Sequence, residues 1–286
     1  MSTTPRPAAP ALLLALALSL SACGDNAPAA SAPEPAPSLI ASPTPSGSAS
    51  VQDRAVALYW LGATADPRGP RLYREFVRLP ATGDPVRQAV AAVLDGDPGD
   101  PDHDSLWADG TEVRDVRRTG STAVVDLSRE ARTNGGGSAF EAATVQQLVY
   151  TATAADPSLT AVELRVEGER VETLWGAVGT GEPLRRAPAA EVLGPVWIDA
   201  VEGHDVGSRV GGSATVFEAT VSWDLQQDGR TVQEGFSTAT EGAPGRGTWT
   251  AELDLPPGEY LLRAWESSAE DGSVSWLETR NVRVSR

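Results

Sequence analysis

The spacing of apolar residues changes once along this chain, and that change limits which folds the chain can adopt. Residues 51–178 mix alternating apolar runs with runs of helical spacing, whereas residues 195–286 contain only short alternating runs. Alternation places every second side chain on one face of a strand, and spacings of three and four gather side chains on one face of a helix. The sequence therefore predicts two domains of different fold class, separated by a linker at 179–194 that contains Gly, Pro and Arg without a regular period.

The first domain is expected to belong to the α+β class. Strands are predicted at 55–61 and 72–79, where apolar and aromatic residues dominate. Asp84 has a side chain that favours the N-cap of a helix, and Pro85 suits the first helical turn, where a backbone N–H would have no partner. A helix is therefore expected to begin at Pro85.

A second helix is predicted after Ser138, because Ser138 and Glu141 have the spacing of a capping box. A hairpin is expected at 112–127, and another is expected to join strands at 162–166 and 171–174. Together these elements predict a mixed sheet with two helices packed on one face.

The second domain, residues 195–286, is expected to be an immunoglobulin-like β-sandwich. Its alternating runs are separated by turn residues such as Asp228-Gly229. About seven strands in roughly ninety residues fit that fold. Trp223 and Trp249 alternate with apolar or small residues along their runs, and we expect both in the core of the sandwich.

The N-terminus has the pattern of an export signal. Residues 11–20 are apolar without interruption, and as a helix they would extend roughly 15 Å, too short for a bilayer core of roughly 30 Å. The Leu-Ser-Ala-Cys that follows resembles the bacterial lipobox, which implies that residues 1–22 are removed and that Cys23 carries a lipid with acyl chains such as palmitate. The alternative is an ordinary signal peptide beside an unrelated cysteine.

The segment that follows the lipobox is expected to be a disordered tether. Residues 23–50 are rich in Pro, Ala and Ser and hold almost no large apolar side chain, so they cannot bury enough surface to offset the entropy of ordering. No later segment is apolar for long enough to span a membrane. The expected location of the folded part is therefore the extracytoplasmic face of the cell membrane, held there by the lipid.

The composition of the chain excludes several functions. The formal net charge of −16 disfavours binding to nucleic acid and to anionic lipid headgroups. All 23 basic residues are Arg, so the chain has no lysine for a phosphate-binding loop of the Walker type or for a Schiff base. Cys23 is the single cysteine, and its acylation would leave no thiol for a disulfide, a metal or catalysis.

An acidic loop offers weak candidates for a calcium site. Asp100, Asp102 and Asp104 begin like an EF-hand loop, in which carboxylates surround the ion. Ser105 and Thr111, however, stand where such a loop requires Gly and Glu. The alternative is a solvated acidic loop, and we expect neither a metal nor a cofactor.

No coherent catalytic set is visible, and we do not expect an enzyme. His103 and His204 are the two histidines, and no G-x-S-x-G nucleophile motif occurs. Trp265 and Trp276 are candidates for a binding surface, because exposed aromatic rings stack on sugars or anchor protein interfaces. The alternative is that these rings cover the edge of a small core.

Particular pieces of the sequence resemble two families. The pieces VALYWLG, AVAAVLDG, DGTEVRDVRRTGSTAVVDLS, QQLVYTAT and VELRVEGERV occur in this order in residues 55–175, which resemble the GerMN domain of sporulation and spore-germination lipoproteins. Residues 196–284 contain GGSATVFEATVSWDL, EGF and GRGTWTAELDLPPGEYLLRAWESSAEDGS, and they are similar to the Gmad-type immunoglobulin-like domain that often follows GerMN. The resemblance implies an extracytoplasmic, non-catalytic module.

These features lead to the hypothesis of a membrane-anchored lipoprotein with a binding or scaffolding role in a complex of the cell envelope. The expected partners are other envelope proteins or further copies of the GerMN-like domain, with cell-wall polymer as an additional ligand. The alternative is a lipoprotein that binds or hydrolyses cell-wall glycan. A third hypothesis is a germination factor proper.

Overall fold

The structure is a computed structural model that describes residues 53–62, 69–133, 137–199 and 206–285. Residues 49–286 form one compact unit. Cys23 and the predicted signal peptide and tether lie outside the described residues, as does His204. None of the described helices has both the length and the apolar character that a membrane crossing requires.

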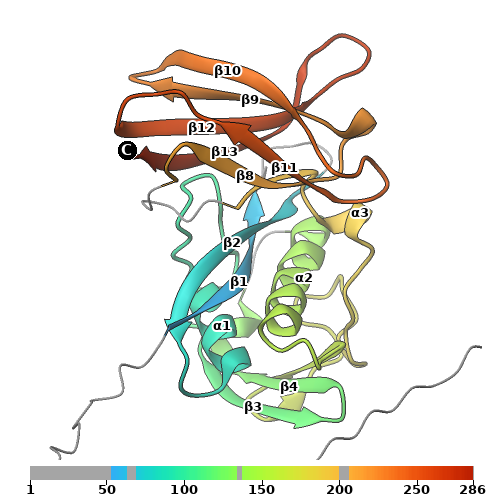
Figure 1. The fold of residues 1–286 in the computed structure, drawn as a ribbon. Helices are drawn as coiled ribbons and strands as arrows, with labels where there is room; N and C mark the ends of the chain where they lie inside the picture. Colours follow the sequence, from blue (N-terminus) through green and yellow to red (C-terminus); the bar gives the residue numbers. More distant parts are fainter. Residues whose placement is uncertain (1–52, 63–68, 134–136, 200–205, 286) are drawn as a thin grey trace, which may run out of the picture. The chain divides into compact units, whose positions relative to one another are not determined.

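The first domain begins with an antiparallel hairpin of two long strands, β1 (Asp53–Gly62) and β2 (Arg71–Pro80) (Figure 1). Both strands were predicted from the sequence and are confirmed. One face of β1 packs into the main core of the domain through Val56, Leu58 and Trp60. Its other face belongs to a second buried cluster, which also includes Trp197 of the following domain. The hairpin is therefore buried on both sides.

Helix α1 (Pro85–Leu94) follows the hairpin and begins as the sequence predicted. The side chain of Asp84 accepts a hydrogen bond from the backbone N–H of Arg87 at 3.0 Å, and Pro85 occupies the first turn. Asp84 also accepts a hydrogen bond from Arg118 of the neighbouring sheet at 2.5 Å. One carboxylate thus caps the helix and joins it to the sheet.

Helix α2 (Ser138–Ala155) begins differently from the prediction, because no capping box forms. Gly137 is the N-cap residue, and no side chain caps the helix. The carboxylate of Glu141 is buried and accepts hydrogen bonds from the backbone N–H groups of Ala177 and Val178, each at 2.7 Å. The sequence predicted a capping box because Glu141 lies three residues after Ser138, but this spacing does not show which backbone N–H groups the carboxylate binds.

Four strands form the mixed sheet that the sequence predicted: β3 (Val113–Thr119), β4 (Thr122–Leu127), β5 (Ala161–Val166) and β6 (Glu169–Arg170). β4 and β5 are parallel and are connected through α2, whereas the outer pairs are antiparallel hairpins. Side chains of α1 and α2 share one hydrophobic core with β1, β4 and β5. The short 3-10 helix η1 (Arg129–Arg132) follows β4.

The strand predicted at 171–174 is wrong, since β6 ends at Arg170. The chain beyond it turns back on itself, with a bridge between Thr173 and Gly179, and the turn between them is held by Glu141. The backbone N–H groups of this turn therefore bond to a helix side chain instead of to a neighbouring strand.

The segment predicted as a linker runs along the first domain. Leu184 exchanges two backbone hydrogen bonds with Val162 of β5, and the hydroxyl of Tyr150 donates to the carbonyl of Ala187 at 2.7 Å. The single-turn helix α3 (Ala189–Val192) follows and leads into the second domain.

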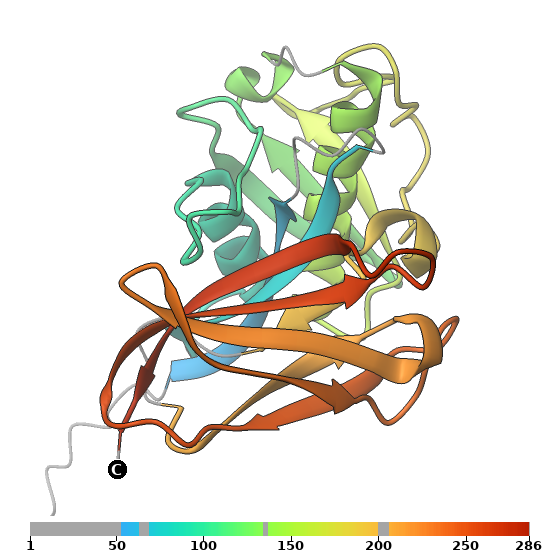
Figure 2. The same ribbon diagram turned by 90° about the horizontal axis from the view of Figure 1, so that it is seen from above.

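The second domain is an antiparallel β-sandwich of seven strands among the described residues (Figure 2). One sheet has the order β10 (Arg230–Thr238), β9 (Thr220–Gln227), β12 (Gly258–Ser267) and β13 (Val274–Val284). The other has the order β11 (Gly247–Glu252), β8 (Arg209–Ala214) and β7 (Val196–Ile198). The 3-10 helix η2 (Phe217–Ala219) connects β8 to β9. This arrangement confirms the immunoglobulin-like prediction.

Two tryptophans link the core of the sandwich to the first domain. Trp249 donates a hydrogen bond from its indole N–H to the carbonyl of Trp197 at 3.1 Å, and Trp197 donates in turn to the carbonyl of Leu72 on β2 at 3.1 Å. Gly212 lies under this chain of contacts, and a Cβ there would be 1.8 Å from the carbonyl oxygen of Trp197. Trp223 and Trp249 both lie in the core, as predicted.

The role of Glu141 is tested by comparing Glu141→Ala with Ser138→Ala. We expect Glu141→Ala to lower the free energy of unfolding by about 2–3 kcal/mol, because it removes charge-assisted hydrogen bonds to the turn at 175–178. Ser138→Ala is expected to change it by less than about 0.5 kcal/mol. Urea unfolding measures both values, and equal losses in the two variants would contradict this assignment.

The pairing of Asp84 with Arg118 should appear in the pH dependence of stability. Burial acts to raise the pKa of Asp84, but hydrogen bonds from Arg118 and from the backbone of Arg87 outweigh it and lower the pKa below 3.8. A lowered pKa stabilises the fold above the unfolded value, and the stabilisation is lost as the pH falls through the folded value. Asp84→Asn keeps a capping side chain and removes the charge.

We therefore expect native protein to exceed Asp84→Asn in stability by about 0.5–1 kcal/mol at pH 7, and we expect this difference to shrink as the pH falls below 3.8 and the carboxylate becomes protonated. Urea unfolding at a series of pH values measures the difference. A gap that stays constant down to pH 2 would show that the charge of Asp84 plays no part.

Candidate functional site

Five titratable or charged side chains meet in the interior where the two domains contact each other. We call them the junction cluster: Glu75 of β2, Asp100 and His103 of the loop between α1 and β3, and Glu278 and Arg280 of β13. None is more than 6% exposed. Charged side chains are rarely buried to this degree, so this cluster is the most unusual chemical feature of the described residues.

His103 lies at the centre of the junction cluster. Its Nδ1 is 2.6 Å from an oxygen of Glu75, and its Nε2 is 3.3 Å from an oxygen of Glu278. The ring of Tyr73 stacks on the imidazole with a centroid distance of 5.4 Å. Gly62 allows this packing, because a Cβ at that position would be 2.5 Å from the ring of Tyr73.

Arg280 lies close to all three carboxylates of the cluster. Its guanidinium nitrogens are 3.4 Å from Asp100, 3.6 Å from Glu75 and 3.8 Å from Glu278. These distances are ion-pair contacts longer than ordinary hydrogen bonds. The carboxylates of the first domain and the arginine of the second thus neutralise one another across the domain boundary.

The surroundings shift the pKa values of three members of the cluster. Burial acts to lower the pKa of His103, but Glu278, Glu75 and Asp100 outweigh it and raise this pKa to about 10. Burial raises the pKa of Asp100 to about 6, against the opposing effect of Arg280. Burial also acts to raise the pKa of Glu75, yet the hydrogen bond from His103 and the charge of Arg280 lower it overall.

The spacing of charged residues in β13 is a sequence signal for this cluster. Glu278, Arg280, Val282 and Val284 are every second residue along β13, so their side chains point to the same face of the strand. Charged residues in register with core valines indicate that the strand meets another buried polar surface. Glu75 is likewise a buried acid, on β2, where Tyr73 precedes it on the same face.

The three calcium candidates from the sequence bind different partners. Asp100 joins the junction cluster, while Asp102 accepts a hydrogen bond from the hydroxyl of Thr279. Asp104 exchanges backbone hydrogen bonds with Leu61, and its carboxylate accepts from its own neighbour in the chain. The metal-capable group that the described residues do form consists of Asp100, His103 and Glu278.

A second set of contacts between the domains surrounds Trp197. Its ring lies between the guanidinium groups of Arg74, 4.7 Å from the ring centroid, and Arg246, 3.9 Å from it. Arg74 also forms a bidentate ion pair with Asp199, with both oxygens at 2.7 Å. Burial and the charge of Arg74 lower the pKa of Arg246 to about 10, and its guanidinium donates to the backbone carbonyl of Gly194 at 2.6 Å.

Trp276 lines a pocket of about 490 Å³ that both domains build. The guanidinium of Arg71 on β2 lies 5.1 Å from the centre of the Trp276 ring. The rest of the lining consists of Ala189, Ala190, Leu193, Pro195, Thr215, Pro244 and Arg246, which are apolar apart from the hydroxyl of Thr215 and the cation of Arg246. Among the described residues that line this pocket none is Asp or Glu, whereas glycoside hydrolysis uses a pair of carboxylates.

Trp265 does not line this pocket. It lies on β12, half-buried, and its indole N–H donates to the hydroxyl of Ser267 at 3.2 Å. The guanidinium of Arg263 is 5.7 Å from its ring centre. The structure therefore places the two tryptophans proposed for binding in different surroundings.

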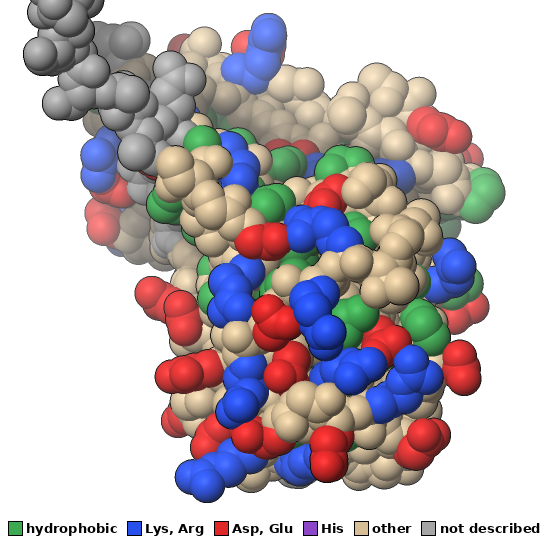
Figure 3. Space-filling model, turned by 90° about the horizontal axis from the view of Figure 1, so that it is seen from below, with side chains coloured by type: hydrophobic (Ala, Val, Ile, Leu, Met, Phe, Trp, Pro, Cys, Tyr) green, Lys and Arg blue, Asp and Glu red, His purple; other side chains and the backbone are tan. Residues whose placement is uncertain are grey.

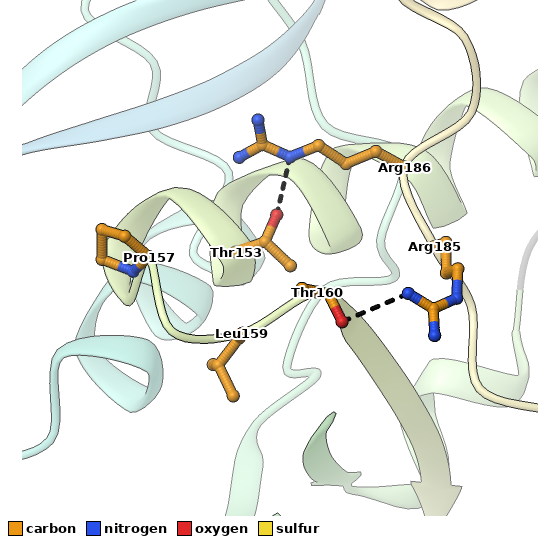
Figure 4. A pocket seen from close by; sticks show the side chains of 6 residues that line it. All are labelled: Thr153, Pro157, Leu159, Thr160, Arg185 and Arg186. Carbon is orange, nitrogen blue, oxygen red and sulfur yellow. Dashed lines mark hydrogen bonds between the residues drawn. The ribbon is translucent and has the colours of Figure 1, made fainter. Parts of the chain in front are cut away.

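Another pocket, of about 440 Å³, lies where the segment after β6 meets α2 (Figure 4). Arg186 donates to the hydroxyl of Thr153 at 2.7 Å, and Arg185 donates to the hydroxyl of Thr160 at 3.2 Å. Pro157 and Leu159 complete the labelled lining. Both arginines thus hold their own segment on the first domain, and the described lining of the pocket contains neither an acid nor a histidine.

Acidic and basic side chains are interleaved over the face shown in Figure 3. Ion pairs such as Arg114 with Glu167 at 2.8 Å and Arg170 with Glu163 at 2.7 Å occur on the mixed sheet of the first domain. On this face, charges of opposite sign therefore lie beside one another instead of gathering into a basic patch.

The importance of the junction cluster is tested by Arg280→Met. We expect this variant to lose about 3–5 kcal/mol of unfolding free energy, because three buried carboxylates lose their arginine. Arg283→Met is a matched control on the same strand, where Arg283 forms an exposed ion pair with Glu259. The control should lose less than about 1 kcal/mol. Urea unfolding compares the two, and a small loss in Arg280→Met would contradict the role given to the cluster.

Two family models match the chain. Residues 57–172 match Germane, described as sporulation and spore germination. Residues 189–273 match Gmad2, the immunoglobulin-like domain of bacterial spore germination. No curated protein has significant sequence similarity to the chain.

Solved structures with detectable similarity include a protein from Clostridium perfringens described as a lipoprotein, with 19% identity and a TM-score of 0.34 over 48% of this chain and 89% of that one. The first GerMN domain of the sporulation protein GerM from Bacillus subtilis has 21% identity and a TM-score of 0.37, over 46% of this chain and 95% of that one. The tandem GerMN domains of the same protein have 18% identity and a TM-score of 0.39, over 70% and 61% of the two chains.

The two family models carry the assignment, and they occur in the order that the sequence resemblance implied. Neither describes an enzyme. This chain therefore contains a GerMN-type domain of the sporulation and spore-germination family, followed by a Gmad2-type immunoglobulin-like domain of bacterial spore germination.

Proposed function

We propose that this protein is a lipid-anchored component of the cell envelope that binds and positions other envelope molecules without catalysing a reaction. The anchor is the acylated Cys23, and residues 23–50 are the tether between the membrane and the folded part. Both matching families are of the sporulation and germination type, and the lipobox-like sequence before Cys23 supports a role outside the cytoplasm.

The Trp276 pocket is the observation that carries this proposal. Arg71 and Trp276 come from different domains, yet their side chains stack on each other at its edge. An aromatic ring, prolines and two arginines form a surface suited to an extended protein segment with acidic groups. The described residues of its lining offer an aromatic ring and cations instead of carboxylates, which supports binding over hydrolysis.

The proposed partners are other envelope proteins, and self-association through the GerMN domain is the second mode of assembly. A ligand of cell-wall glycan is an alternative occupant of the pocket, favoured by the exposed part of the Trp276 ring. Hydrolysis of that glycan would need a pair of carboxylates that the pocket lining does not provide.

The pocket is tested by photo-crosslinking in the bacterium that makes the protein. A photoreactive amino acid at position 190, on the pocket lining, should capture a defined envelope protein from the full-length anchored chain. Trp276→Ala should reduce this product at least about fivefold, since a binding hot spot contributes upwards of 1 kcal/mol. Trp265→Ala is the control and should leave it unchanged.

Fractionation of the same cells tests the anchor. The native chain should remain with membranes, and Cys23→Ser should be released, because the lipid is the proposed link. A crosslinked product whose yield is unaffected by Trp276→Ala would contradict the proposed role of the pocket in binding. A Cys23→Ser chain that stays with membranes would contradict the proposed lipid anchor. Transfer of the crosslink to glycan in place of protein would favour the alternative ligand.

A further inference from the structure

The junction cluster contains a set of donor atoms that suits a metal ion. Asp100, His103 and Glu278 each present one ligand atom, and these atoms lie within 4.8 Å of one another. All three residues are buried, and two come from the first domain and one from the second. Nitrogen and carboxylate donors in one buried group are the ligands of zinc and similar divalent metals.

Several buried atoms of this cluster have no hydrogen-bond partner. They are Asp100 Oδ2, Glu278 Oε1, and Nε and Nη2 of Arg280. The carboxylates that carry the two unpartnered oxygens are 0% and 2% exposed. These oxygens face the two unpartnered nitrogens of Arg280 at 3.4 Å and 3.8 Å, too far for good hydrogen bonds, so a cation bound by the same carboxylates would strengthen a weakly paired group.

The geometry around His103 fits metal ligation. Glu75 accepts a short hydrogen bond from Nδ1, which leaves Nε2 to face Glu278 at 3.3 Å. Two ligand atoms about 2.1 Å from a tetrahedral metal are separated by ~3.4 Å. A carboxylate on the far nitrogen is also the usual partner that orients a metal-binding histidine. Glu75 occupies that position.

The charges of the cluster agree with a divalent ion. Glu75, Asp100 and Glu278 contribute three negative charges, and Arg280 contributes one positive charge. Metal binding at Nε2 would displace the proton that His103 otherwise carries there, and the three carboxylates and Arg280 would then leave a surplus of two negative charges, which is strongly unfavourable in the interior. One divalent cation would balance it.

We propose that Asp100, His103 and Glu278 bind one divalent cation of the zinc type, with Glu75 orienting His103 and Arg280 neutralising the outer carboxylate oxygens. Calcium suits the set poorly, because it prefers six to eight oxygen ligands. Since the ligands belong to both domains, the cation would hold the domains together. This site is distinct from the calcium loop considered from the sequence, which comprised Asp100, Asp102 and Asp104.

Titration calorimetry with Zn²⁺ alone tests the proposal on the full chain carrying Cys23→Ser, a change that removes the only thiol. We expect one Zn²⁺ per chain and a rise in melting temperature with Zn²⁺ concentration, because a ligand of the folded state stabilises it. Glu278→Gln should weaken binding at least about 100-fold, and Glu75→Gln about 10- to 100-fold. Asp102→Asn is the matched control and should bind as the native chain does.

X-ray absorption spectroscopy at the zinc edge identifies the ligands in the native chain, so it tests the proposal even if a variant fails to fold. The native chain should show one imidazole and otherwise oxygen ligands. The proposal is overturned by the absence of a 1:1 Zn²⁺ complex, by a zinc shell without imidazole, or by unchanged affinity in a folded Glu278→Gln variant. Tighter binding of Ca²⁺ than of Zn²⁺, lost in Asp102→Asn, would place the site in the acidic loop and overturn it equally.

Discussion

The contacts between β2 and β13 determine how the two domains are held. Glu75 and Arg280 are both buried, and neither is surrounded by water that would compensate its charge. Each carboxylate of the cluster is stable inside the protein only while the opposite domain supplies a cation or a proton donor. The relative position of the domains is therefore set by charges that tolerate little displacement, because separating them would leave ions unpaired in the interior.

The contacts of Trp197 fix the orientation of the two domains more narrowly than the attraction between charges does. The indole N–H of Trp197 donates to the carbonyl of Leu72 at 3.1 Å, and arginines from both domains lie over the faces of its ring. Hydrogen bonds and stacking are more directional than charge attraction, so they select one arrangement. The Trp276 pocket depends on that selection, since Arg71 and Trp276 meet at its edge only when β2 and β13 keep their positions.

Local sequence patterns were sufficient for most elements. The cap at Asp84, the strand alternation of the sandwich and the two families were recognisable because each depends on residues that are close in the chain. Glu141 was misassigned because its spacing from Ser138 fits a capping box, whereas its real partners lie more than thirty residues away. The strand expected at 171–174 was wrong because the turn that follows it is held by Glu141, a residue far away in the sequence.

The junction cluster was harder to predict, because its members are separated by up to 205 positions in sequence, from Glu75 to Arg280. His103 was noticed as one of two histidines and Asp100 as part of an acidic loop, but their partners on β13 were not. A pairing of this kind becomes visible only when the register of both strands is known. The local indications were the register of Glu278 and Arg280 with Val282 and Val284 on β13, and the acid Glu75 between aromatic and apolar residues on β2.

The central claim is that these buried charges hold the two domains in one arrangement. Spin labels at Arg117 in the first domain and Phe236 in the second, both exposed, allow the distance between the domains to be measured by pulsed electron paramagnetic resonance in a Cys23→Ser background. One narrow distance distribution is the result that this account predicts. A broad distribution, or several separate distances, would show that the domains move independently and would contradict it.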